Sequence, residues 1–594
     1  MAYGYMKTDS SINIHKRSQA VIFRGKASLL QLSRGLKNLF DSDLKNHSFS
    51  NELKNAPVIA ESKTPLWTEA APEEQFLLAG KIHNLRLAVK KLNNLQIPAN
   101  EIFSFWKSVG QATRLKGFVV GRELREGCVI PNVGGGLCQL SNALYDAALK
   151  ANFEIVERHA HTQIISGSLA EKNRDATVFW NYVDLRFRSP NAFRIEAFLG
   201  KDHLTVRFRS DFKKQTFFQI SKTEKQNSKG KLPNSCATCG VESCFRSLQP
   251  IIKDFGKTAF LIDEYSPEFD DYIQKARKQR DEIYLPLDGK RFKKANYAWN
   301  TNGFSKIKQS FLITAFRSYK SRKLAAQGAA RQKNLLAMYE KLAESYAKNL
   351  RHDVLHVVVQ QNLLPFLWKS GALGGRTFDV LMSSLPMREI QKKLDYAAAL
   401  QTESKTLSDF RADEDLINAE FEALENADKI ITSHTHIADL FIDKAEILEW
   451  KVPNKSEIKR VKNEKFTIVF PASTVGRKGC YELREAVRGV DAKILTLGAQ
   501  IEGEDFWKGF DTEKTRGNDW LEKADLIVLP AFVEHRPRRI LQAAANKIPA
   551  IVSEECGIGA SENIETIKAG DADALREKIL SHLVKTESLQ TFSL

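Results

Sequence analysis

Hydrophobic residues change their spacing along the chain, and these changes mark candidate domains. Residues 1–75 show weak periodicity and many Ser, Asn and Lys residues, which predicts a partly ordered extension. Residues 76–215 begin with helical spacing in EEQFLLAGKIHNLRLAVKKL and continue with alternating runs such as ATVFWNYVDLRFR and FRIEAFLG, the period of β-strands. This succession predicts an α+β domain.

Short apolar runs, each followed by helical spacing, fill the chain after residue 256. Runs such as DVLHVVVQ, DKIITSH, FTIVFPAS and DLIVLPA have the length of buried strands, and their alternation with helices predicts parallel α/β sheets. A break near LEWKVPNKSEIKRVKNEK divides this region into two units, 256–455 and 456–590, and a polar linker at 216–255 precedes them. The predicted fold class is therefore multidomain, an α+β domain followed by a double α/β module.

Length and composition agree with a folded protein of several domains. The chain has 594 residues, of which 43% are hydrophobic and 27% charged, and this length exceeds what one core can use. No run of about 18 apolar residues occurs, and basic residues interrupt the apolar stretches near the start. Seven cysteines are few and odd in number, which suits a reducing compartment. We therefore expect a cytoplasmic protein.

The formal net charge of +17 favours anionic partners. The excess is densest between Lys290 and Arg351, where basic clusters alternate with apolar stretches such as SFLITAF and NLLAMYEKL. A basic amphipathic helix there would lie on the inner face of an anionic membrane, and the alternative is a solvated helix face. Phosphate-bearing substrates are the other expected partners, and no nucleic acid is expected.

The stretch IPNVGGGLCQLSNALYDAALKANFEIVERHAH, from Ile130 to His161, contains the strongest candidate chemistry. Its three glycines, Gly134 to Gly136, precede a predicted helix that begins near Cys138. Glycines permit a tight turn with close backbone access, and the positive end of a helix favours a thiolate. Cys138 is therefore positioned to be reactive.

His159 and His161 lie near the end of a predicted strand over 153–161 and, two residues apart, point to the same side. A helix of about 20 Å followed by a returning strand of about 26 Å brings them back to Cys138. The next run supplies side chains that can orient an imidazole: Asp175, Asn181 and Asp184. Nucleophile, base and orienter would thus meet. Two alternatives remain, a zinc site of Cys138 with both histidines and a buried structural cysteine.

The run from FSFWKSVG to VERHAHTQ, followed by DATVFWNYVDLRF, resembles the VanW family over roughly residues 95–190. This family is named from vancomycin-resistance clusters, so the resemblance implies a link to the bacterial cell envelope. The motif positions carried onto this chain are Gly134, Gly135, Gly136, Cys138, Gln139, Arg158, His159, His161 and Asp175. We assign the cysteine, the histidines and the aspartate to catalysis, and the glycines, Gln139 and Arg158 to substrate binding.

A second cysteine group, in NSCATCGVESCFRS, lies within the predicted linker. Cys236 and Cys239 have the spacing that chelates one metal, and Cys244 supplies a third thiolate for zinc or an iron–sulfur cluster. The fourth ligand is missing locally and could come from Cys480, Cys556, a histidine or a non-protein group. A disulfide between Cys236 and Cys239, or no cofactor at all, are the alternatives.

The segment from FTIVFPASTVGRKG to IPAIVSEECGI resembles the nucleotide-sugar half of group 1 GT-B glycosyltransferases. The resemblance implies that Arg477 and Lys478 hold the donor diphosphate, a role that two cations beside a helix N-terminus can perform. Of the two glutamates typical of the family, Glu534 matches the first. Gln542 stands at the second, where an amide can still hydrogen-bond to the ribose of the donor.

Residues 256–455 resemble the acceptor-side half of the same double Rossmann fold, which implies a substrate cleft at the carboxyl ends of its strands. His434 and His436 follow such a strand end and could face the cleft. The leading hypothesis is therefore transfer of a sugar from a nucleotide-sugar donor to an envelope glycan or lipid-linked acceptor. A thiol-dependent amidase or acyl transferase with a sugar-recognising module, and a non-catalytic scaffold for envelope assembly, are the alternatives.

Overall fold

The computed structural model describes residues 17–68, 74–125, 128–161, 168–211, 234–236, 241, 244, 255–324, 328–455, 458–461, 463–515, 517 and 519–591. The chain forms two compact units. The first comprises Met1–Lys257, Leu350–Leu355 and Ser370–Arg376, and the second comprises Thr258–Asn349, His356–Lys369 and Thr377–Leu594.

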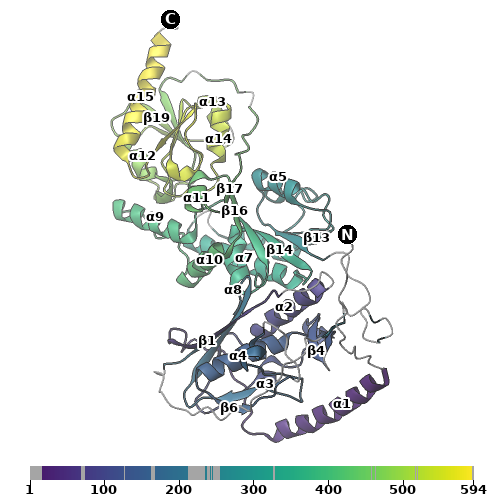
Figure 1. Cartoon of the computed structure of the whole chain (residues 1–594). Helices are drawn as coiled ribbons and strands as arrows, with labels where there is room; N and C mark the ends of the chain where they lie inside the picture. Colours follow the sequence, from purple (N-terminus) through teal and green to yellow (C-terminus); the bar gives the residue numbers. More distant parts are fainter. Residues whose placement is uncertain are drawn as a thin grey trace, which may run out of the picture. The chain divides into compact units, whose positions relative to one another are not determined.

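The first unit is built on an antiparallel sheet with the order β1-β9-β8-β2. These strands are β1 (Val58–Pro65), β9 (His203–Arg209), β8 (Phe193–Leu199) and β2 (Leu95–Ile97). Two helices pack against this sheet, α2 (Gln75–Val89) and α4 (Leu137–Lys150) (Figure 1). The predicted α+β class of this part of the chain is therefore confirmed.

Two three-stranded sheets complete the first unit and hold the ends of α4 in place. One contains β10 (Asn234–Ser235), β5 (Cys128–Val133) and β4 (Val120–Arg125), and the other contains β3 (Ile102–Ser104), β7 (Arg186–Arg188) and β6 (Glu154–Glu157). Strand β5 runs into the glycine loop before α4, and β6 follows α4. The apolar side of α4, with Leu140 and Leu144 fully buried, faces the core.

The second unit contains two parallel sheets, as the alternation of apolar runs and helices predicts. The first has the order β13-β12-β11-β14-β15-β16-β17 and the second β20-β19-β18-β21-β22-β23. Between β11 and β14 the strand order reverses, which creates a topological switch point in the first sheet. The strands of the first sheet are β11 (Lys257–Leu261), β12 (Glu282–Leu285), β13 (Lys306–Gln309), β14 (Val354–Gln360), β15 (Thr377–Leu381), β16 (Lys429–Thr432) and β17 (Ala445–Ile447).

The second sheet of this unit consists of β18 (Phe466–Phe470), β19 (Ala492–Thr496), β20 (Thr512–Lys514), β21 (Leu526–Leu529), β22 (Ala550–Ser553) and β23 (Ile564–Ile567). The helices of the unit are α5 (Pro267–Ala276), α6 (Phe311–Arg322), α7 (Ala329–Asn349), α8 (Leu364–Lys369), α9 (Met387–Leu400), α10 (Glu414–Asn426), α11 (Thr435–Leu440), α12 (Cys480–Ala486), α13 (Trp520–Lys523), α14 (Arg538–Ala545) and α15 (Ala572–Thr591). A double α/β module thus follows the α+β domain.

The segment expected to be a partly ordered extension, 1–75, contains the long helix α1 (Arg17–Phe40) and strand β1. Strand β1 pairs with β9 along its whole length, so it belongs to the main sheet. The predicted linker 216–255 lies mostly outside the described residues, and β10 is part of it. Within the part of the chain that the structure describes, no helix combines the length and apolar character needed to cross a bilayer.

Candidate active site around Cys138

The glycine loop before α4 packs so closely against its neighbours that side chains would not fit. A Cβ atom on Gly135 would lie 2.6 Å from the backbone of Gly121, and one on Gly136 would lie 2.1 Å from Cγ of Lys81. Gly136 also has a φ of +102°, in the left-handed region that favours glycine. Close packing therefore restricts the loop to one backbone conformation at the start of α4.

Cys138 is the second residue of α4, so its sulfur lies at the positive end of the helix. The sulfur lies 3.8 Å from Oγ1 of Thr177 and 3.9 Å from the carbonyl oxygen of Val178. Its side chain is half-buried at the edge of the core. Cys138 thus lies at the helix start, as predicted, and its reactivity stays a prediction.

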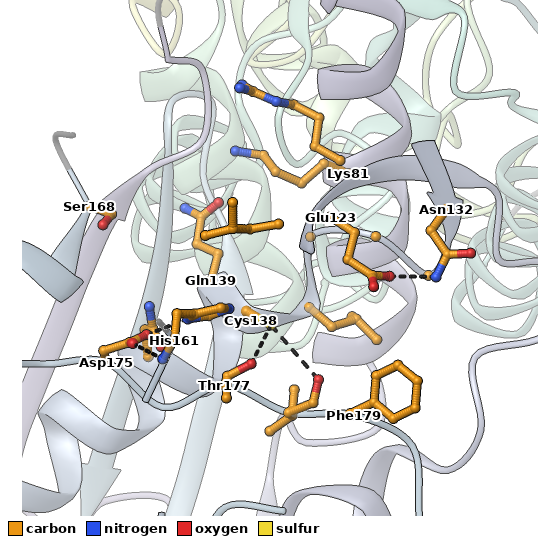
Figure 2. Close-up of a pocket in the computed structure, with 18 of the residues that line it drawn as sticks. Lys81, Glu123, Asn132, Cys138, Gln139, His161, Ser168, Asp175, Thr177 and Phe179 are labelled. Atoms are coloured by element: carbon orange, nitrogen blue, oxygen red, sulfur yellow. Dashed lines mark hydrogen bonds and ion pairs between the residues drawn. The ribbon is translucent and has the colours of Figure 1, made fainter. Parts of the chain in front are cut away.

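His161 and Asp175 form a tight pair beside this sulfur (Figure 2). Nδ1 of His161 donates to Oδ1 of Asp175 at 2.7 Å, and the backbone N–H of His161 donates to Oδ2 of the same carboxylate. Burial disfavours a charge on His161, but hydrogen bonds to Asp175 and to the Cys138 sulfur outweigh it and raise the pKa of His161 to about 10. Since Asp175 takes Nδ1, Nε2 of the imidazole is left for the sulfur.

These three residues line a cavity of about 530 Å³ within the first unit. Its walls carry aromatic rings, among them Trp106 and Trp180 in edge-to-face contact at 5.5 Å. They also carry a buried amine, that of Lys81, whose Nζ donates to the carbonyl oxygen of Leu66 at 2.9 Å. Burial, and then the charge of Arg122, lower the pKa of Lys81 to about 7. The cavity therefore combines apolar walls with a few fixed polar groups, as small-molecule sites do.

In the second unit the structure brings two of the predicted donor-binding residues together. Nζ of Lys478 lies 2.9 Å from Oε2 of Glu534, and Lys478 follows β18 as expected. Glu534 also accepts hydrogen bonds from the backbone N–H groups of His535 and Arg536. Although burial opposes it, the charge of Lys478 holds the pKa of Glu534 below its ordinary value.

The other two predicted donor residues are located differently. The guanidinium of Arg477 lies over the ring of Phe410, 5.0 Å from its centroid. Gln542 is a half-buried residue of α14. The negative charge of Glu534 acts on Arg477, so Arg477 lies in the electrostatic environment of the Lys478–Glu534 pair.

A second cavity, of about 230 Å³, lies in the second unit at the carboxyl ends of β14 and β16, at the switch point of the first sheet. Three residues that line it each carry a buried polar atom without a hydrogen-bond partner in the described residues, namely Oγ of Ser433, Nδ1 of His434 and Nδ1 of His535. Nε2 of His434 donates to the carbonyl oxygens of Glu534 and Glu555, which leaves Nδ1 as an acceptor. His436 does not line this cavity.

Comparison with known proteins gives a family match for part of the first unit. Residues 80–209 match the family model described as VanW like protein. That stretch of the chain is a VanW-like domain. It shares 38% identity over 107 residues with an uncharacterised protein of Bacillus subtilis, YoaR, and 27% over 172 residues with the vancomycin B-type resistance protein VanW of Enterococcus faecalis. These matches cover 18% and 28% of this chain, and 35% and 62% of the relatives.

The second unit is similar to several solved structures, including glycosyltransferases. Sucrose-phosphate synthase of Thermosynechococcus elongatus is 13% identical with a TM-score of 0.36, covering 55% of this chain and 90% of that one. WaaG, a glycosyltransferase of lipopolysaccharide biosynthesis, is 14% identical with a TM-score of 0.34, covering 56% and 91%. Anabaena HepE, solved with UDP and glucose, is 11% identical with a TM-score of 0.34, again covering 56% and 91%. The two parallel sheets themselves give this unit its α/β class.

Two motif residues of the VanW-like domain take other positions than predicted. The side chain of His159 is 52% exposed, lies 3.5 Å from Glu157, and does not line the cavity of Cys138. Regular strand structure ends at Glu157, so the alternation that would align His159 with His161 does not extend to them. Arg158 does not line the cavity either, because Nε donates to the carbonyl oxygen of Asp175 and the guanidinium covers Tyr145. Arg158 is thus a positioning residue.

Gln139 and the three glycines line the cavity, and their role in binding a substrate stays a prediction. The amide of Gln139 donates to Oγ1 of Thr64 and to the carbonyl oxygen of Pro65, which fixes its orientation. Lys81, Arg122 and Glu123 are cavity residues that the sequence analysis missed. Lys81 lies far from the glycine motif in sequence, whereas Arg122 and Glu123 lie on the preceding strand β4, and no local pattern distinguishes the three from surface charges.

Of the predicted metal ligands in the VanW-like unit, Cys239 lies outside the described residues. Cys236 packs with Cys128 and Ile130 in a small apolar cluster, and Cys244 is buried. Among the described residues, a group that could hold a cation lies in the second unit. It consists of His356, Asp379 and Asp428, whose ligand atoms lie within 4.8 Å of one another. The zinc or iron–sulfur cluster therefore stays a prediction.

Proposed function

We propose that the VanW-like domain performs thiol-dependent acyl transfer or amide hydrolysis on a bacterial cell-envelope precursor. The observation that carries this proposal is the meeting of Cys138, His161 and Asp175 in one cavity, with the carboxylate 2.7 Å from Nδ1 of the imidazole. A nucleophile, a base and a group that orients the base are the parts that acyl transfer through cysteine requires. The similarity to a vancomycin resistance protein supports an envelope substrate.

The proposed acyl-transfer steps follow from where Cys138, His161 and Asp175 hold their protons. The thiolate of Cys138 attacks a carbonyl carbon, a C–S bond forms, and the C–N or C–O bond of the tetrahedral intermediate then breaks. The imidazolium of His161 gives its proton to the leaving amine or alcohol, which leaves a thioester. Water or an acceptor amine then attacks the thioester, returns its proton to His161 and regenerates the thiolate. Asp175 holds the ring in one orientation and stabilises its charge.

An activated ester tests this function without knowledge of the natural substrate. Wild-type protein incubated with p-nitrophenyl acetate should release nitrophenolate and gain one acetyl group on Cys138, detected by peptide mass spectrometry. Cys138→Ala should lose the acetylation, and His161→Ala should slow it at least about tenfold. His159→Ala is the matched control and should react like the wild type. Acetylation of Cys138 at equal rates in both histidine variants would contradict the proposal.

For the second unit we propose transfer of a sugar from a nucleotide-sugar donor to an envelope glycan or lipid-linked acceptor. The supporting observation is the 230 Å³ cavity, three of whose lining residues carry an unpartnered buried polar atom, because such atoms are costly unless a polar ligand satisfies them. The hydroxyl groups of a sugar could donate to Nδ1 of His434. Lys478 would neutralise the diphosphate after exchanging Glu534 for a phosphate oxygen.

Ligand-observed NMR with a panel of nucleotide sugars tests this second function. A donor that binds should lose affinity in Lys478→Ala and in His434→Phe, the first through its diphosphate and the second through its sugar. A free nucleotide, which lacks the sugar, should lose affinity in Lys478→Ala but not in His434→Phe. A panel without any binder, under conditions where the protein is folded by circular dichroism, would contradict transfer by this unit.

A further inference from the structure

Helix α1 exposes an apolar side that is unusual for a helix attached to a folded domain. Seven of its large apolar residues are at least half exposed: Val21, Ile22, Leu29, Leu32, Leu36, Leu39 and Phe40. Ile22, Leu29 and Leu36 repeat every seven residues, as do Leu32 and Leu39, so about two turns separate neighbours along one side of the helix. An apolar stripe of this length is a marker of an interaction surface.

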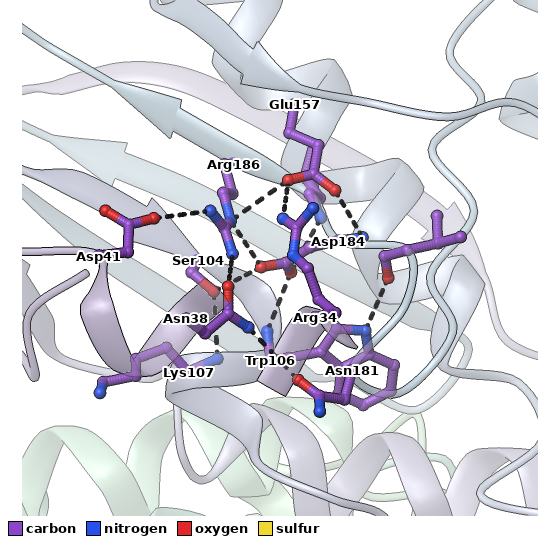
Figure 3. A network of polar contacts seen from close by, with 12 residues as sticks. Arg34, Asn38, Asp41, Ser104, Trp106, Lys107, Glu157, Asn181, Asp184 and Arg186 are labelled. Carbon is purple, nitrogen blue, oxygen red and sulfur yellow. Dashed lines mark hydrogen bonds and ion pairs between the residues drawn. The ribbon is translucent and has the colours of Figure 1, made fainter. Parts of the chain in front are cut away.

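The opposite, polar side of α1 is the one that contacts the VanW-like unit (Figure 3). Arg34 forms an ion pair with Glu157, and Nη2 of Arg186 donates to Oδ1 of Asn38 at 2.8 Å. Asn181 donates to the carbonyl oxygen of Gln31 at 2.6 Å. Because polar contacts hold the helix from this side, its apolar side is turned away from the core of the domain.

The charges of α1 indicate which kind of partner binds its apolar side. The helix contains five basic residues and no acidic one: Arg17, Arg24, Lys26, Arg34 and Lys37. Lys26 and Lys37 are exposed and about three turns apart, so they flank the apolar stripe on the same side. We propose that α1 lies on an anionic membrane surface, with its leucines among the acyl chains and its lysines at the headgroups. This arrangement is typical of interfacial amphipathic helices.

A second copy of the chain is the competing occupant, because a seven-residue repeat also suits a coiled coil. Two such helices would bring Lys26 and Lys37 of each copy to one interface, and α1 has no acidic residue to pair with them, so like charges disfavour that pairing. Anionic lipid has the complementary charge. Gln31 of α1 also lines the cavity of Cys138, so docking of this helix would bring that cavity close to the headgroups.

Co-sedimentation of the full chain with vesicles tests this surface. Vesicles of phosphatidylcholine with phosphatidylglycerol should bind the protein, and pure phosphatidylcholine vesicles should bind it at least about tenfold more weakly, since each lysine near an anionic surface contributes roughly fivefold. Leu32→Glu combined with Leu36→Glu should lower binding to the anionic vesicles at least about tenfold. Lys26→Gln combined with Lys37→Gln should also weaken it.

Leu115→Glu is the matched control, because Leu115 is a fully exposed leucine of the same unit outside α1. It should bind anionic vesicles like the wild type. Equal binding by the wild type and the Leu32/Leu36 variant, with both folded by circular dichroism, would overturn the proposal. So would a dimer in light scattering that the same variant converts to a monomer, since a second copy would then cover the helix.

Discussion

Two histidines separated by a single residue have different roles, and the difference arises from their surroundings. Both Asp175 oxygens engage His161, one through the imidazole and one through the backbone N–H. His159 contributes only its carbonyl oxygen to the same region, as acceptor from the N–H of Thr177. The sequence identifies the pair, but the irregular segment after Glu157 decides which ring faces the sulfur.

The charge of His161 should make stability depend on pH. Its pKa is raised from 6.5 to about 10 in the folded protein by the two groups that face it, Asp175 and Cys138. The folded state therefore binds the proton more tightly, and this stabilisation is complete below about pH 6.5 and lost as pH rises toward 10. The free energy of unfolding of the wild type, minus that of His161→Gln, should fall with pH across this window, by at most about 1.4 kcal/mol per unit.

Urea unfolding followed by circular dichroism, at intervals from pH 6 to pH 10, measures this difference. His159→Gln serves as the control, because an exposed imidazole contributes little. A difference between wild type and His161→Gln that stays constant over the range would show that His161 carries no stabilised charge.

At the scale of elements, the glycine loop and helix α4 were predictable because their signals are local. Three glycines, a cysteine and an apolar repeat indicate a turn followed by a helix, and α4 begins at Leu137. The buried parallel strands were predictable for the same reason, since continuous apolar runs mark them. The cavity walls were not, because Lys81 and Glu123 reach the site only through packing of α2 and β4 beside the loop.

Substitution in the glycine loop should damage the start of α4. In Gly136→Ala the added methyl group meets Lys81 and the residue must keep a φ of +102°, so we expect a loss of about 2 kcal/mol or more in the free energy of unfolding. Gly25→Ala is the control in α1, where a Cβ atom meets nothing within 4 Å. It should leave stability unchanged or raise it by up to about 1 kcal/mol. Equal losses in both variants would argue against a sterically fixed loop.

At the scale of the whole molecule, two compact units carry two candidate sites with different chemistry. The VanW-like unit offers a thiol, an imidazole and a carboxylate, whereas the second unit offers Lys478, Glu534 and a polar cavity. Residue patterns indicated the site around Cys138, and the resemblance to group 1 GT-B glycosyltransferases implied the donor residues of the second unit. They could not give the pairing of Lys478 with Glu534, because these residues come from loops after different strands.

The two activities should be separable by single substitutions. Cys138→Ala should abolish acyl transfer to thiol-reactive esters and leave nucleotide-sugar binding unchanged, because the second unit does not contain the sulfur. Lys478→Ala should weaken binding of the donor diphosphate at least about tenfold and leave esterase turnover intact. Ester hydrolysis and donor titration on the same three proteins measure both outcomes. Loss of both activities in either variant would mean that the sites are not independent.

The central claim is that His161, held by Asp175, activates Cys138. Its most direct test is the rate at which iodoacetamide alkylates Cys138 at pH 7, followed by peptide mass spectrometry because the chain has seven cysteines. We predict that His161→Ala slows this alkylation about tenfold or more, whereas His159→Ala leaves it within about twofold of the wild type. Equal rates in the wild type and both variants would contradict the claim.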